Sequence, residues 1–142
     1  MEVPDEISLG LIILGCPLHC PECHSSWTWS KKQPQLEINQ TNLAQVLSPF
    51  HSCILFFGGE WEADFSLALE SVLTWFNLPL ALYTGLTTEQ TLAQPWIELL
   101  TYVKTGPYIK ACGGLRSEQT NQRMFKLSAG KIIREYKFYG PK

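Results

Sequence analysis

Residues 7–23 read ISLGLIILGCPLHCPEC, and this stretch decides the expected fold. Its first half, residues 7–14, is a short apolar run that is long enough for a buried strand and too short to indicate a helix. Its second half places Cys16, Cys20 and Cys23 on the loop that follows. We therefore expect a strand whose carboxyl end leads into a loop with three clustered cysteines.

The same order of strand, loop and helix recurs along the chain. Expected strands cover residues 7–14, 52–57 and 78–83, and expected helices cover 39–47, 63–76 and 88–94. Residues 96–104 are apolar and ambiguous, with a strand expected in their second half. Residues 123–127 and 131–135 predict a terminal hairpin. Three repeats of strand, loop and helix predict an α/β domain with a mostly parallel sheet.

Polar or glycine-rich segments follow each of the first three expected strands. The cysteine loop follows the first, Gly58-Gly59-Glu60 follows the second, and Thr84-Gly85 follows the third. In sheets of this kind, ligands bind outside the carboxyl ends of the strands. We therefore expect all three segments to converge on one edge of the sheet.

Length and composition limit the fold classes. A chain of 142 residues is expected to form about one domain, and it is too short for a closed eight-fold β/α barrel, which needs roughly 200 residues. Hydrophobic residues make up 45%, which excludes disorder. Charged residues are only 17% and aromatic residues 12%, which indicates either an apolar docking surface or uncharged polar residues in place of charges.

Charge and hydropathy also exclude partners. The net charge of −2 gives no general affinity for phosphate backbones, so no nucleic-acid partner is expected. No run of about 18 apolar residues exists, so no membrane partner is expected. Residues 11–16, LIILGC, resemble a lipoprotein cleavage site, but the preceding segment is acidic and no lysine or arginine comes before Lys31. We therefore expect a cytoplasmic protein.

The five cysteines indicate a metal centre in a reducing compartment. Their number is odd and three of them lie within eight residues, which is a poor disulfide framework. Cys53 precedes an apolar run and is expected to be a small buried hydrophobe. Cys112, beside two glycines, is ambiguous.

Two metal chemistries fit the cysteine loop. Zinc needs four ligands, and His19, His24 or Cys112 would have to complete the set, although no second cysteine pair is present. A cubane iron–sulfur cluster generally takes four cysteines. With three, it would leave one iron open for a ligand from outside the protein.

The spacing Cys-x3-Cys-x2-Cys after the first strand, with Gly-Gly-Glu after the second, resembles the radical S-adenosylmethionine (radical SAM) enzymes. The resemblance implies a [4Fe-4S] cluster on Cys16, Cys20 and Cys23. It implies that the amino and carboxylate groups of S-adenosylmethionine chelate the open iron. It also implies an incomplete β/α barrel formed by a single domain, residues 1–142, with the cluster loop at 15–30.

A finer resemblance is to the activating proteins of glycyl-radical enzymes, above all those of anaerobic ribonucleoside-triphosphate reductases. The similar segments are residues 15–29, 57–60, 83–85, 103–108 and 115–123. This resemblance implies that the protein generates a glycyl radical on the reductase large subunit. It implies a low-potential electron donor such as a flavodoxin, and no catalytic residue beyond the cluster ligands.

The resemblance also implies a set of residues that contact S-adenosylmethionine. They are Glu22, His24, Gly58, Gly59, Glu60, Tyr83, Thr84 and Gly85, with Asn121 and Arg123 as further candidates. Two positions depart from many relatives: Glu22 stands in place of an aromatic residue, and His24 in place of a common tyrosine.

Two other functions stay open. One is a small-molecule radical SAM enzyme of the deazapurine-synthase type, from which a neighbouring reductase gene would distinguish an activating enzyme. The other is a non-catalytic zinc-binding interaction module, which metal analysis would separate from an iron–sulfur protein.

Overall fold

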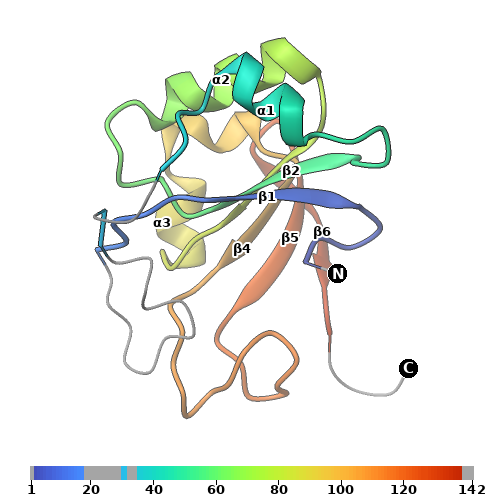
Figure 1. Ribbon diagram of the computed structural model, residues 1–142. Coiled ribbons are helices and arrows are strands. Elements are labelled where there is room, and N and C mark those ends of the chain that lie inside the picture. Colours follow the sequence, from blue (N-terminus) through green and yellow to red (C-terminus); the bar gives the residue numbers. More distant parts are fainter. Residues whose placement is uncertain (1, 18–29, 32–34, 139–142) are drawn as a thin grey trace.

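The computed structural model describes residues 2–17, 30–31 and 35–138 (Figure 1). Six strands form one sheet, and the helices lie between the first four strands in sequence. In chain order the elements are β1 (Ser8–Ile12), α1 (Gln40–Val46), β2 (Cys53–Phe57), α2 (Phe65–Phe76), β3 (Leu80–Tyr83), α3 (Thr88–Leu92), the 3₁₀ helix η2 (Pro95–Leu99), β4 (Tyr102–Thr105), β5 (Arg123–Ser128) and β6 (Lys131–Tyr136).

The strands lie side by side in sequence order, from β1 at one edge to β6 at the other. β1 to β4 are parallel, whereas β5 runs antiparallel to both β4 and β6. In the parallel part, Ile12, Phe57, Tyr83 and Lys104 are in register across four strands. The carboxyl ends of these strands therefore share one edge.

The expectation of an incomplete β/α barrel with a mostly parallel sheet is wrong. The sheet is open, because β1 and β6 lie at its two ends and do not pair with each other. It is mixed, because two of its five strand pairings are antiparallel. Parallel strands need a long crossover, usually a helix, and the segment between β4 and β5 contains none. β5 and β6 are joined by the tight turn at Ala129-Gly130, where both residues have positive φ. A turn this short can only join antiparallel strands.

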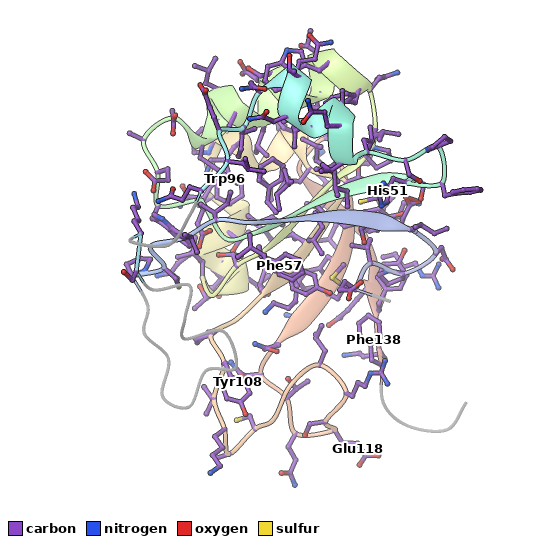
Figure 2. All side chains as sticks on the ribbon, viewed as in Figure 1. His51, Phe57, Trp96, Tyr108, Glu118 and Phe138 are labelled. Atoms are coloured by element: carbon purple, nitrogen blue, oxygen red, sulfur yellow. The ribbon has the colours of Figure 1, made fainter. Side chains whose placement is uncertain are left out.

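The helices cover one face of the sheet and build the larger core (Figure 1). Phe65, Leu69 and Val72 of α2 are buried at helical spacing and pack on this face. On the opposite face lies a smaller cluster: Val3, Cys53, Leu55, Ala81, Tyr102 and Met124. Figure 2 shows the two sides, with Trp96 in the helical layer and Phe57 across the sheet from it.

Several local predictions are confirmed. Cys53 is fully buried, and burial raises the pKa of its thiol to about 12, so it behaves as a small hydrophobe. The ambiguous residues 96–104 split into η2 and β4, which puts the strand in their second half. The terminal hairpin is present as β5 and β6. Among the described helices, none is long and apolar enough to cross a membrane.

Candidate functional site

The carboxyl ends of β1, β2 and β3 meet at one edge of the sheet, as expected. The Ile13 N–H donates to the Phe57 carbonyl at 3.2 Å, and the Gly58 N–H donates to the Tyr83 carbonyl at 3.0 Å. Cys16 lies on the loop after β1 and is half-buried. The structure therefore brings the start of the cysteine loop, Gly58-Gly59-Glu60 and Thr84-Gly85 to the same edge.

The turn after β2 requires its two glycines. Gly58 has φ +81° and Gly59 has φ +107°, in the left-handed region that other residues rarely adopt. A Cβ atom on Gly58 would overlap the Trp61 ring, and one on Gly59 would come within 3.0 Å of Ile13. The two glycines therefore let the chain turn sharply while Trp61 and Ile13 pack directly against its backbone.

The Glu60 carboxylate is fixed at one oxygen and unsatisfied at the other. The Thr84 hydroxyl donates to Oε1 at 2.8 Å, and Thr84 in turn accepts the Leu86 N–H at 3.1 Å. Oε2 is buried, and no described residue donates a hydrogen bond to it. Buried carboxylate oxygens are normally paired. This oxygen therefore fits a donor supplied by a ligand, such as an ammonium group.

Burial dominates the electrostatics of Glu60. It raises the pKa of the carboxyl above its usual value, while the Thr84 hydrogen bond, the backbone of Glu60 and the nearby Lys104 charge lower it in part. A cation placed at Oε2 would favour the charged carboxylate and lower the pKa further.

Thr84→Val tests the hydrogen bond that orients Glu60. Thr84 is only 2% exposed, so the change leaves buried polar groups unpaired. We expect the free energy of unfolding to fall by about 1–3 kcal/mol. Thr84→Ser keeps the hydroxyl and is the control. Urea denaturation measures both, and equal losses in the two variants would contradict a role for the hydroxyl.

Tyr83 points away from this edge. Its hydroxyl donates to the Glu2 carbonyl, and its ring packs edge-on against Phe57 at 5.3 Å between centroids. Burial raises the pKa of the phenol. The Lys104 ammonium lies 5.0 Å from the centre of the same ring. The side chain of Tyr83 is thus held in the smaller core, while Thr84 and Gly85 lie at the site.

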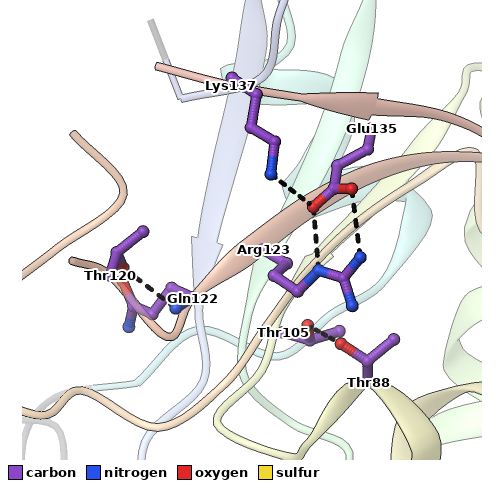
Figure 3. A network of polar contacts seen from close by, with 7 residues as sticks. All are labelled: Thr88, Thr105, Thr120, Gln122, Arg123, Glu135 and Lys137. Atoms are coloured by element: carbon purple, nitrogen blue, oxygen red, sulfur yellow. Dashed lines mark hydrogen bonds and ion pairs between the residues drawn. The ribbon is translucent and has the colours of Figure 1, made fainter. Parts of the chain in front are cut away.

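Asn121 and Arg123 lie at the start of β5, beside the end of β4. The Asn121 amide donates to the Pro107 carbonyl at 2.9 Å. The Arg123 guanidinium donates to both Glu135 oxygens, at 2.9 and 3.1 Å, and Lys137 donates to the same carboxylate (Figure 3). These interactions with Arg123 and Lys137 hold the pKa of the Glu135 carboxyl below its usual range. Arg123 is therefore engaged within the hairpin.

Four of the candidate residues lie outside the described part of the chain: Cys20, Glu22, Cys23 and His24. Within the described ranges, no group of three His, Cys, Asp or Glu side chains could hold a metal. Cys112 lies in the segment between β4 and β5, which also carries Tyr108 and Glu118 and extends away from the helical layer (Figure 2). The ligand set Cys16, Cys20 and Cys23 stays a prediction.

Sequence reasoning missed an ion pair that ties the far end of the cysteine loop to the turn after β2. The Lys31 ammonium donates to Glu62 at 2.5 Å. Its aliphatic stem lies so close to Gly15 that a Cβ there would be 2.6 Å from Lys31 Cε. Lys31 and Glu62 are 31 positions apart in the sequence, and no periodic pattern links them. The only sequence signal was that Lys31 is the first lysine or arginine of the chain.

A family model described as a 4Fe-4S single cluster domain matches residues 7–134, nearly the whole chain. The chain therefore belongs to the 4Fe-4S single cluster domain family, and it is an iron–sulfur protein. This membership favours a [4Fe-4S] cluster over zinc at the cysteine loop. The searches of curated proteins and of solved structures found no match.

Proposed function

We propose that this protein is a radical SAM enzyme that generates a glycyl radical on an anaerobic ribonucleotide reductase. The observation that carries the proposal is Glu60, whose buried and unpaired Oε2 lies at the edge where the cysteine loop begins. A plain electron carrier has no need of a desolvated carboxylate beside its cluster. An enzyme that binds the ammonium group of an amino-acid cofactor does.

When bound here, a reduced [4Fe-4S] cluster would supply one electron to the sulfonium of S-adenosylmethionine, giving methionine and a 5′-deoxyadenosyl radical able to take a hydrogen atom from a glycine Cα. Cys16, Cys20 and Cys23 would hold the cluster through three thiolates. Protein groups around such a cluster bind, orient and shield the reactants.

The described residues at this edge have separate tasks. Glu60 accepts the ammonium group through Oε2, and Thr84 fixes the carboxylate through Oε1. Gly58 and Gly59 adopt the positive φ angles of the turn that sets Glu60 at this edge. Lys31 and Glu62 tie the cysteine loop to the same turn. None of these groups needs to transfer a proton.

A large substrate is consistent with the open sheet. The described helices pack on one face, and the opposite face carries the smaller apolar cluster formed by Val3 and by side chains of β2 to β5. A glycine-bearing loop of the reductase large subunit would approach from outside the helical layer. Electrons would come from a low-potential donor such as a flavodoxin.

Electron paramagnetic resonance tests the proposal directly. The reconstituted protein is incubated anaerobically with S-adenosylmethionine, a reductant and the reductase large subunit. We expect a glycyl radical signal on the reductase, which disappears when S-adenosylmethionine is omitted. Release of 5′-deoxyadenosine without any protein radical would contradict the activating role and favour a small-molecule substrate of the deazapurine type.

A further inference from the structure

At the outer edge of the sheet, the described residues leave backbone groups of β1 without a hydrogen-bond partner. On its inner side β1 bonds to β2, and this pairing ends where the Ile13 N–H donates to the Phe57 carbonyl. Successive residues of an edge strand alternate between bonding inward and pointing outward. The N–H and C=O groups of Ser8, Gly10 and Ile12 therefore point away from β2. No described residue bonds to them.

The two edges of the sheet differ in how they are protected. β6 carries Lys131, Arg134 and Glu135, charges that discourage another strand from pairing. β1 and its flanks, residues 7–14, carry no charge and no proline. Natural proteins protect such edges with charges, prolines or bulges, keep the strand short, or cover the edge with another element. β1 has neither charge nor proline, so its edge is open to pairing with another strand.

Exposed apolar side chains lie beside this edge. Ile12 and Val46 are each 49% exposed and Leu36 is 79% exposed. A groove of about 660 Å³ runs along β1, lined by β1 and residues 35–46 and, at its rim, by the charged residues Lys31, Glu62 and Asp64. Figure 1 shows α1 above β1 on this side of the molecule. An added strand would cover both the backbone groups and the apolar surface.

We propose that this edge binds β1 of a second copy of the chain, antiparallel, so that two sheets join into one. With Gly10 opposite the partner's Gly10, Ser8 pairs with the partner's Ile12 and Ile12 with the partner's Ser8. This register satisfies all three outward-pointing residues, and a shift by two residues in either direction loses one of the pairs. It also places Leu9 opposite the partner's Leu11, on the face that carries the groove.

The sequence of β1 favours its own copy over an unrelated strand. A two-fold interface must be self-complementary, with residue i on j and j on i. Around Gly10 the strand is symmetric in this sense, with leucine on both sides and no charge that would face a like charge. The glycines at the axis leave no side chains to clash between the two strands.

Sedimentation velocity of the full chain, over a wide range of concentrations, tests the dimer. Ile12→Lys places a charge at the interface, and Ile133→Lys is the matched control, because Ile133 is 60% exposed on the opposite edge strand. We expect the wild type and the control to dimerise equally. We expect Ile12→Lys to weaken dimerisation by about tenfold or more.

Hydrogen exchange on the wild-type protein provides a second measurement that needs no variant. The amides of Ser8, Gly10 and Ile12 should exchange slowly at high concentration and fast on dilution. A wild type that stays monomeric at its highest attainable concentration would overturn the proposal. A dimer in which these amides stay unprotected would also overturn it, as would equal weakening of the dimer by Ile12→Lys and Ile133→Lys. Pairing of this edge with the reductase alone, and not with a second copy, would overturn it as well.

Discussion

We expect Cys16→Ser to abolish the iron–sulfur cluster and, with it, the proposed cleavage of S-adenosylmethionine. This is the largest effect expected of any single change. Cys16 is one of only three thiols in the cysteine loop, and serine oxygen is a poor ligand for iron in such clusters. The measurements are the iron and sulfide content and the visible absorbance after anaerobic reconstitution.

Cys112→Ser is the matched control for that variant. Cys112 is also half-buried, but it lies in the segment between β4 and β5. We expect this variant to reconstitute like the wild type. If Cys112→Ser lost the metal as fully as Cys16→Ser did, Cys112 would be a fourth protein ligand. A closed four-ligand site would contradict the open iron on which the proposed chemistry depends.

Glu60→Gln is expected to weaken the binding of S-adenosylmethionine by about ten- to a hundredfold while leaving the cluster in place. The loss corresponds to one hydrogen bond between charged groups. Equilibrium binding to the reconstituted protein measures it. Glu89→Gln, an exposed change on α3, is the control. Unchanged affinity in Glu60→Gln, or loss of its cluster, would contradict the role given to this carboxylate.

The same variant should be more stable than the wild type without ligand. Because burial raises the pKa of Glu60, the folded state binds its proton more tightly than the unfolded state. The free energy of unfolding of the wild type therefore falls as pH rises through the usual carboxyl range towards the raised pKa. Glutamine does not ionise, so Glu60→Gln does not lose stability in this way as the pH rises. The advantage of Glu60→Gln in urea denaturation should grow with pH over that range.

Local sequence patterns predicted the elements well where burial alone decides them. Cys53–Phe57 and Leu80–Tyr83 are apolar runs ended by glycine or threonine, and both are central strands. The spacing of Phe65, Leu69 and Val72 predicted α2. Each of these patterns reflects the burial of one helix face or one apolar strand, so it can be recognised without knowing which distant residues pack against it.

The mixed sheet could not be predicted in the same way. Whether β5 runs parallel or antiparallel to β4 depends on the path of residues 106–122, which carry no periodic pattern. The resemblance to barrel-forming enzymes favoured a parallel arrangement. The turn at Ala129-Gly130 pointed to antiparallel pairing at the end of the chain, and that local signal was correct.

The part of the candidate site that lies directly after the ends of parallel strands could be predicted from the sequence. Parallel strands with a common edge bring Glu60 and Thr84 together, and the structure adds the hydrogen bond between them. The Lys31–Glu62 ion pair depends on how two loops fold back, which sequence spacing does not encode. The open edge of β1 emerged only from the strand order.

The most direct test of the central claim is release of 5′-deoxyadenosine by anaerobically prepared protein. The protein is purified, analysed for iron, sulfide and zinc, and incubated with dithionite and S-adenosylmethionine. We predict a coloured protein with iron and sulfide that releases 5′-deoxyadenosine and methionine. A protein that holds its cluster but never cleaves the cofactor, or a colourless one that carries zinc and no sulfide, would contradict the account.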